Sequence, residues 1–254
     1  MADILHRLEL LQVLARTQLK IRYKNAALGY LWSLAHPLAF AGVFYFVFQV
    51  VMKSNRPDMA AFLVTGLFPW QWVSNSTVQG TSIFISNASL VKKVAFPRYM
   101  LPLSMVLQDG WHFLLALPVQ LLIVLASGHA PSLAWIPGLP LLLLLQGGVL
   151  FGIALIVGSI NMFLRDIEHL VHILMMMLFY GTPIVYDLAQ VPGTYRPILQ
   201  LNPFTPLISC WRSLLLEGRL DWSEIGVLAL AAAVLIAVGG AIYNKLSPRF
   251  AELV

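Results

Sequence analysis

Long apolar stretches with almost no charge make up most of this chain. The 33 residues from Met59 to Val91 contain no Asp, Glu, Lys or Arg, and neither do the 55 residues from Gly110 to Leu164. Uncharged apolar runs of about 20 residues are typical of helices that cross a bilayer. The polar–apolar alternation of membrane β-strands is missing. The pattern therefore predicts an all-α integral membrane protein.

Breaks in this pattern divide the chain into six predicted spans. The 55-residue run must contain a turn, which we place at residues 127–132, because one span needs only about 20 residues. The fifth span is short and is interrupted by Gly181 and Pro183. Four prolines then leave residues 187–222 in pieces too short to cross, which suit small helices dipping into the membrane surface. The predicted spans are residues 31–52, 62–86, 101–126, 140–163, 170–186 and 225–243.

Residues 4–24 have the pattern of an amphipathic helix that lies on the membrane surface. One side of this helix carries Glu9, Gln12, Arg16, Lys20 and Lys24. The opposite side carries Ile4, Leu8, Leu11, Ala15 and Leu19. A solvated N-terminal helix is the alternative interpretation.

A short basic segment, residues 87–98, separates the second and third spans, and we call it the basic island. It contains Lys92, Lys93 and Arg98, and Pro97 closes it. Only 11% of the residues are charged and 59% are hydrophobic, against about 25% charged in soluble domains. Lipid must therefore be the solvent for much of the surface, and the island must sit at a membrane face.

The distribution of Lys and Arg predicts which face this is. With six spans, 11 of the 16 basic residues fall on the side that holds both termini, the basic island and Arg165, and 5 fall on the other. Cytoplasmic loops carry the excess of positive charge. We therefore expect both termini and the island in the cytoplasm. The net charge of +5 has the same origin, and no nucleic-acid partner is expected.

Polar and aromatic residues inside the spans have two open interpretations. Asn75, Gln79, Ser82 and Ser86 recur at i, i+4, i+7 and i+11, where lipid would leave them unsatisfied. They either face a substrate path or hydrogen-bond to a neighbouring helix. Aromatic residues of the first two spans either face lipid or stack on the C–H faces of sugar rings along a path. These aromatic residues are Phe40, Phe44, Phe48, Trp70 and Trp72.

Asp109 is the one acidic residue well inside a predicted span. Intramembrane acids are candidates for proton coupling, which would make the chain a secondary transporter of a lipid or sugar. The structural alternative is a hydrogen bond to a neighbouring helix, to Trp111 or to His112.

Motifs for catalysis are missing from this sequence. A Walker A loop needs a lysine after glycine, and none of the six lysines follows one. His169 and His172 are three residues apart, whereas helical zinc motifs space two histidines by four and add a third ligand. We expect no metal site and no catalytic residue, so the chain is not predicted to be an enzyme. An intramembrane enzyme acting on lipid-linked sugar would need an acid or nucleophile cluster, and none is evident.

Gly148 and Gly152 form a GxxxG pair that permits close helix packing.

Four motifs together give the chain a family resemblance. The island, Asn-Ala-Ser-Leu-Val-Lys-Lys-Val-Ala-Phe-Pro-Arg, resembles a basic stretch of the permease subunits of ABC transporters that export polysaccharides. Three further motifs resemble the same permeases and follow in the same order along the chain. They are Arg22–Lys24 with Leu28–Trp32, then Phe163–Ile167, in which Leu164 is an insertion, and then Leu201–Pro206. Each motif alone is weak, but their order and spacing cover nearly the whole chain.

The resemblance implies one ABC transporter transmembrane domain over residues 1–254. It implies a homodimer in a bacterial cytoplasmic membrane, with a separate ATPase subunit on each copy binding ATP and Mg²⁺. It implies export of O-antigen, capsular polysaccharide or teichoic acid on a lipid diphosphate carrier. The island would carry the coupling helix, and residues 187–216 would form re-entrant helices that gate the outer face.

Three groups of site residues follow from this expectation. The first would contact the ATPase and comprises Ser89, Leu90, Val91, Lys92 and Lys93. The second would attract the diphosphate headgroup, or simply anionic lipids, and comprises Lys20, Arg22, Lys24 and Arg98. The third would line the channel and comprises Phe40, Phe44, Phe48, Trp70, Asn75, Gln79 and Ser82.

Overall fold

The computed structural model describes residues 31–93, 96–200 and 202–253, and every regular element in these ranges is a helix. The predicted surface helix over residues 4–24, with Lys20, Arg22 and Lys24, lies outside the described residues. The long helices are α2 (Leu31–Tyr45), α3 (Met59–Ser86), α5 (Met100–Ala126), α6 (Trp135–Asn161), α7 (Ile167–Tyr180), α9 (Phe204–Leu215) and α10 (Trp222–Leu246). The short ones are η1 (Phe46–Val51), α4 (Ala88–Val91), η2 (Leu188–Gln190), α8 (Arg196–Gln200), η3 (Ser247–Arg249) and α11 (Phe250–Leu253).

All six predicted spans correspond to helices, with shifted ends. The agreement is closest for α5, which begins one residue before the predicted start at 101. By contrast, α6 begins at Trp135 rather than at residue 140. The indole Nε1 of Trp135 donates a hydrogen bond to the Leu214 carbonyl (2.8 Å), and this contact fixes an earlier helix start. The fifth span is shorter than predicted, because α7 ends at Tyr180 just before Gly181 and Pro183.

Several of these helices have the length and apolar character of membrane spans. Within the described residues, α5, α6 and the helical stretch Trp222–Leu253 are long and apolar enough to cross a bilayer. Leu38–Val51 and Ile167–Tyr180 are apolar but shorter. With 28 residues, α3 is long enough to span, but its second half is polar. The fold is therefore that of an all-helical integral membrane protein, and the count of six spans stays a prediction.

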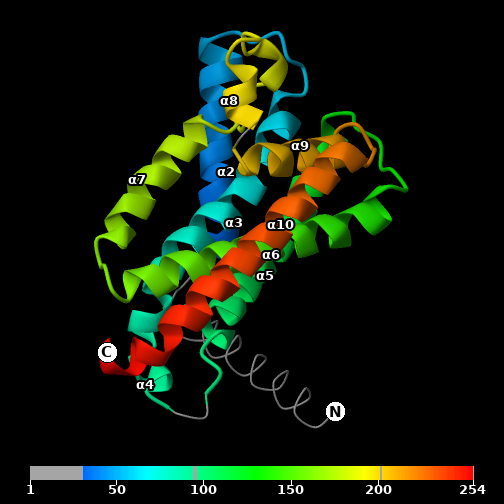
Figure 1. Cartoon of the computed structure of the whole chain (residues 1–254). Helices are drawn as coiled ribbons and strands as arrows, with labels where there is room; N and C mark the ends of the chain where they lie inside the picture. Colours follow the sequence, from blue (N-terminus) through cyan, green and yellow to red (C-terminus); the bar gives the residue numbers. More distant parts are fainter. Residues whose placement is uncertain (1–30, 94–95, 201, 254) are drawn as a thin grey trace.

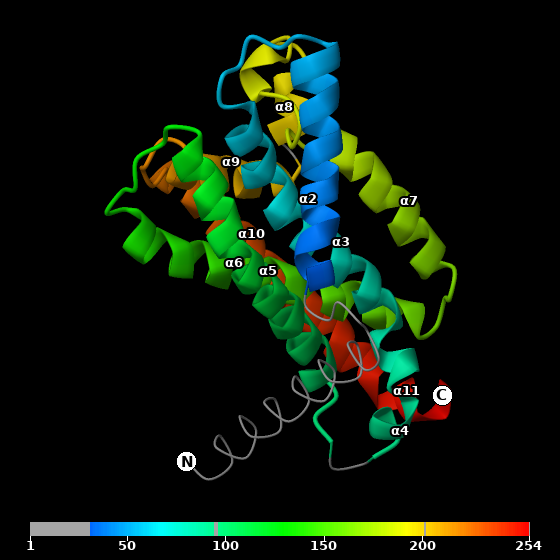
Figure 2. The ribbon, with the colours of Figure 1, turned by 180° about the vertical axis from the view of Figure 1, so that it is seen from behind.

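The helices form a bundle with two distinct ends. One end holds α4, the turn at residues 162–166 and α11, and we call it the island end (Figure 1). The opposite end holds the turn at residues 53–58 together with η2 and α8, and we call it the far end (Figure 1). Seen from behind, α2 runs along the bundle while α7 lies at its edge (Figure 2).

The centre of the bundle is α3, which packs against α2, α5, α6, α7 and α9. Every residue from Ala61 to Trp70 is buried, so its first half is enclosed all round. A helix that is apolar on all sides belongs in such a position. In contrast, α7 buries only Val171 and Met175. The bundle therefore has a well-packed body and a lightly held edge helix.

Glycines set the contact between α6 and α10. A Cβ at Gly152 would lie 2.5 Å from the backbone carbon of Leu235, and one at Gly239 would lie 2.5 Å from the Gly152 carbonyl oxygen. Gly148 is different, because a Cβ there would touch only side chains, at 3.5 Å and beyond. The close packing predicted for the Gly148–Gly152 pair therefore depends on Gly152, with Gly239 as its partner.

We expect Gly152→Ala to destabilise the protein, because the added methyl group meets backbone that cannot move aside. The expected loss is about 1–3 kcal/mol, as for other overpacked cores. Thermal unfolding of the detergent-solubilised chain measures this loss. Gly148→Ala is the matched control and should leave the melting temperature nearly unchanged. Equal melting temperatures for the two variants would show that the helices are not held at this distance.

Candidate functional site

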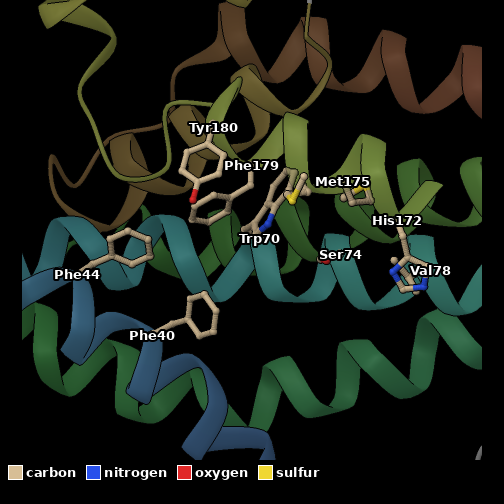
Figure 3. Close-up of a pocket in the computed structure, with 10 residues that line it drawn as sticks. Phe40, Phe44, Trp70, Ser74, Val78, His172, Met175, Phe179 and Tyr180 are labelled. Atoms are coloured by element: carbon tan, nitrogen blue, oxygen red, sulfur yellow. The ribbon is translucent and has the colours of Figure 1, made fainter. Parts of the chain in front are cut away.

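A groove of about 320 Å³ opens between α2, α3 and α7 (Figure 3). We call it the aromatic groove. Side chains from all three helices line it. They are Phe40 and Phe44 of α2, Trp70, Ser74 and Val78 of α3, and His172, Met175, Met176, Phe179 and Tyr180 of α7.

Helical periodicity explains why these residues share one surface. Trp70, Ser74 and Val78 recur every four residues along α3, and His172, Met175, Met176 and Phe179 follow at i, i+3, i+4 and i+7 along α7. Such spacings place side chains on one helix face. Both stripes face each other because α7 packs along α3.

Phe179 is the centre of the ring contacts in the groove. Its ring centroid lies 5.8 Å from that of Phe44, 6.0 Å from that of Trp70 and 5.1 Å from that of Tyr180. These distances are typical of favourable aromatic pairs. Phe179 thus connects α2, α3 and α7 through aromatic faces.

The chemistry of the aromatic groove suits an uncharged or weakly polar guest. Its described lining consists of aromatic rings, thioethers, one valine, one imidazole and the hydroxyls of Ser74 and Tyr180, and among these residues there is no carboxylate, Lys or Arg. Aromatic faces complement the C–H faces of sugar rings and the methylenes of lipid chains. The groove is open at its edge, where Met176 is 62% and Tyr180 66% exposed. Such a surface offers rings and thioethers to a guest along its open side.

Three of the seven predicted channel residues line this groove, namely Phe40, Phe44 and Trp70. Phe48 is next to it and stacks on Phe44 with 6.3 Å between ring centroids. The polar candidates lie elsewhere: Asn75 accepts a hydrogen bond from Gln71, Gln79 points to Asp109, and Ser82 is half-buried. The sequence reasoning missed the α7 stripe, although its i, i+3, i+4, i+7 spacing could have revealed it.

Asp109 is buried and hydrogen-bonded to α3. The Ser76 hydroxyl donates to its carboxylate at 2.9 Å, and the Gln79 amide donates at 3.3 Å. Nearby, the Trp72 indole donates to the Val106 carbonyl at 3.3 Å. The interpretation of Asp109 as a hydrogen-bond partner of a neighbouring helix is confirmed. Of the two interpretations of Gln79, the helix–helix hydrogen bond is the one observed.

The basic island is exposed on one side and anchored on the other. Ser89, Lys92 and Lys93 are exposed, whereas Val91 is completely buried. Within the described ranges, no carboxylate forms an ion pair with either lysine. Both ammonium groups are therefore available to a partner surface or to lipid headgroups.

Two arginines elsewhere in the described chain are ion-paired instead: Arg56 at the far end and Arg219 before α10. Arg56 contacts Asp58 at 3.0 Å and Asp187 at 3.3 Å, and Arg219 contacts Glu217 at 2.6 Å. The Arg56–Asp187 pair links the turn at 53–58 to the segment that follows α7. In the described part of the chain, the island thus presents two adjacent exposed lysines without ion pairs, whereas Arg56 at the far end is bound by two carboxylates.

Arg212 of α9 holds the chain where α7 ends. Its guanidinium donates hydrogen bonds to the carbonyls of Pro183 and Ile184, each at 2.5 Å, and lies 3.6 Å above the Phe62 ring. A Cβ on Gly66 would lie 2.7 Å from the Ile184 carbonyl oxygen, so a glycine is needed there for this close approach. The break after α7 is thus fixed against α3 and α9.

Asp187 makes the far end sensitive to acid. Burial alone would raise the pKa of its carboxyl, but hydrogen bonds from the Ala189 amide and Arg56 hold the pKa below its ordinary value, aided by the charges of Arg56 and Arg212. A depressed pKa means that the ionised form stabilises the fold. This stabilisation is complete above the ordinary pKa, which is about 4, and is lost as the pH falls through the lowered pKa.

We therefore expect Asp187→Asn to lower the melting temperature at pH 7, and the wild-type and variant curves to converge as the pH falls below about 4. Thermal unfolding in detergent across this pH range tests the expectation. Asp166→Asn, at an exposed acid of the island end, is the matched control. A deficit of Asp187→Asn that persists undiminished in acid would contradict the electrostatic explanation.

Known proteins are similar to this chain along almost its whole length. Residues 9–216 match the family described as ABC-2 type transporter. The O-antigen export system permease protein RfbA of Klebsiella pneumoniae is 42% identical over 96% of this chain and 95% of its own length. The protein of the same name from Myxococcus xanthus is 32% identical, over 96% and 94% respectively. The polysialic acid transport protein KpsM of Escherichia coli is 24% identical over 89% of each chain. The chain belongs to the ABC-2 type transporter family of membrane permeases.

Proposed function

We propose that this chain is the permease subunit of a polysaccharide exporter in the bacterial cytoplasmic membrane. Two copies form the path for a lipid-linked polysaccharide, and a separate ABC ATPase subunit bound to each copy supplies the energy. The observation that carries this proposal is the 42% identity with an O-antigen export permease, because it extends over 96% of the chain. It therefore covers the basic island as well as the helices that line the aromatic groove.

In this proposal the island end faces the cytoplasm. The positive-inside rule places the side richer in Lys and Arg in the cytoplasm, and Lys92 and Lys93 of this end are exposed without ion pairs in the described part of the chain. Both termini then lie in the cytoplasm. The exposed face of residues 89–93 contacts the ATPase subunit, which binds the ATP and Mg²⁺ that this chain does not bind itself.

The aromatic groove is the part of each subunit that faces the exported polymer. Its rings supply stacking surface without strong binding, which suits a chain of sugars that must slide past. The diphosphate of the carrier meets Lys20, Arg22 and Lys24 at the cytoplasmic surface, whereas Arg98, also predicted for this role, is engaged with the carbonyls of Val91 and Ser247. Residues 187–216 close the path at the far end, where Arg212 and Arg56 hold them against α3.

The alternative of proton-coupled transport has less support. Asp109 accepts hydrogen bonds from Ser76 and Gln79, both on α3, and so serves helix packing. The aromatic groove lies on another face of α3 and contains no acid. We therefore assign the energy input to the partner ATPase.

Replacing Lys92 and Lys93 together by alanine is expected to reduce export while the chain still inserts normally. Each ammonium contributes about 1 kcal/mol or more to a complementary interface, so the loss of both predicts a decrease of about tenfold or more in ATPase copurification or in surface polysaccharide. Lys53→Ala, at an exposed lysine of the far end, is the control. Wild-type export by the double variant would refute the coupling role of the island.

Ser74→Phe is expected to obstruct the aromatic groove. The added ring fills space beside Trp70 and Val78 that the polymer would use, so export should fall while the amount of bound ATPase stays unchanged. Surface polysaccharide and copurified ATPase are the two measurements. Leu122→Phe, on the exposed face of α5, adds a ring outside the groove and should export normally. Normal export by Ser74→Phe would place the path elsewhere.

A further inference from the structure

Arg98 joins the basic island to the segment that follows α10. Its Nε donates a hydrogen bond to the Val91 carbonyl at 2.9 Å, and its Nη1 donates to the Ser247 carbonyl at 2.5 Å. Val91 ends α4, and Ser247 begins η3 directly after α10. Arg98 is 7 residues from Val91 and 149 residues from Ser247 in the sequence, yet its one guanidinium holds both carbonyls.

Phe250 makes a second connection at the same place. Its side chain is completely buried. Its ring centroid lies 4.9 Å from that of Phe84 in α3, 6.1 Å from that of Tyr243 in α10 and 6.4 Å from that of Phe163 beyond α6. The short helix α11 that carries it packs against α4 at the island end (Figure 1). One ring thus joins the ends of three long helices.

The three helices joined by this ring are already in backbone contact. Beside the Gly152–Gly239 contact of α6 with α10, a Cβ on Gly158 of α6 would lie 2.7 Å from the Gly80 carbonyl oxygen of α3. Such contacts leave no room for one helix to slide past another without separation. We call α3, α6 and α10 the rigid body. The lining of the aromatic groove includes this body's α3 on one side and the lightly held α7 on another.

We propose that Arg98 and Phe250 form a clasp that couples the island to the rigid body, so that a push on the island moves α3, α6 and α10 together. The two residues are positioning residues, since neither needs to touch the ATPase or the polymer. The aromatic groove then changes shape because α3 shifts against α7. This inference rests on the proposed function, and it adds the C-terminal segment 247–253 to the machinery of coupling.

The guanidinium explains why an arginine fills this position. Its planar fork holds several N–H donors in fixed directions and can serve two carbonyls at once, whereas a lysine ammonium acts as a single flexible point charge. Arg98→Lys keeps the charge and should lose part of the connection. Arg98→Gln should lose most of it. Comparison of Arg98→Lys with Arg98→Gln separates the effect of the guanidinium's hydrogen-bonding geometry from the effect of its charge.

The test uses the complete complex of this chain with its ATPase subunit in inverted membrane vesicles. For Arg98→Gln and Phe250→Ala we expect export per ATP hydrolysed to fall about tenfold, which corresponds to about 1.4 kcal/mol. Copurified ATPase and its hydrolysis rate should stay close to wild type. Arg249→Gln and Leu253→Ala change exposed neighbours in the same segment and should export normally. The milder variants Arg98→Lys and Phe250→Leu serve if the others do not accumulate.

A second measurement follows the clasp directly. Leu246→Cys places a thiol on a half-buried side chain next to Ser247, and Cys210, the one native cysteine, is buried near the other end of the bundle. Maleimide labelling at residue 246 should be slow and independent of ATP in an otherwise wild-type chain. It should accelerate about tenfold when Arg98→Gln opens the segment.

Two results would overturn the clasp. One is unchanged export per ATP in both Arg98→Gln and Phe250→Ala, because the island would then act without the C-terminal segment. The other is labelling that accelerates whenever ATP is hydrolysed by the wild-type complex, because the segment would then separate during each cycle. Failure of the proposed function looks different, since the ATPase would not copurify even with the wild-type chain.

Discussion

Lipid offers no hydrogen bonds, and the central helix α3 shows what this constraint demands. Its polar residues would cost several kcal/mol each if they faced hydrocarbon. Two of them are satisfied by another helix: Ser76 and Gln79 donate to Asp109 of α5. The carbonyl groups of α3 are used as well, since Gln146 and Asn161 of α6 donate to Pro69 and Thr81. The resulting network fixes α3 to α5 and α6 along most of its length.

This network divides the molecule into parts that move together and parts that do not. Hydrogen bonds and glycine contacts connect α3, α5, α6 and α10, and any rotation among them would break several contacts at once. Among the described residues, no side-chain hydrogen bond connects the edge helix α7 to these helices. It meets α3 through rings and thioethers, which can slide because their attraction has little directionality. The guiding surface that we propose for a polymer therefore lies where the described bundle is least constrained.

Hydropathy predicted the fold well because a bilayer imposes one simple rule on every span. The positions of α3, α5, α6 and α10 could be read from uncharged runs, whereas α7 ends at Tyr180, before the predicted end at residue 186. Partners could not be read in this way. The sequence showed that Gln79 and Asp109 each need a hydrogen-bond partner. It did not show that they bond to each other, because these residues are 30 positions apart on two helices that can pack in many registers. The α7 stripe was overlooked for a different reason, since Met and Phe on a span also suit contact with lipid.

Counting charges had a similar limit. The positive-inside rule treats Arg56, Arg212 and Lys92 alike, although the first is ion-paired, the second serves backbone carbonyls and the third is exposed. What distinguishes them is the geometry of their neighbours, which depends on contacts between residues far apart in the sequence. The candidate site was predicted best where local periodicity was sufficient, as for Phe40 and Phe44, and least well where long-range pairing decided.

The size of α4 explains why the island needs support from elsewhere. A helix of four residues is far below the length at which an isolated helix is stable in water. A force applied to Lys92 or Lys93 would simply unfold it unless its end were fixed. The buried side chain of Val91 and the hydrogen bond from Arg98 to its carbonyl provide that fixation. Because the same guanidinium also binds the Ser247 carbonyl, a displacement of the island has a direct route to α10 and through Gly239 to α6.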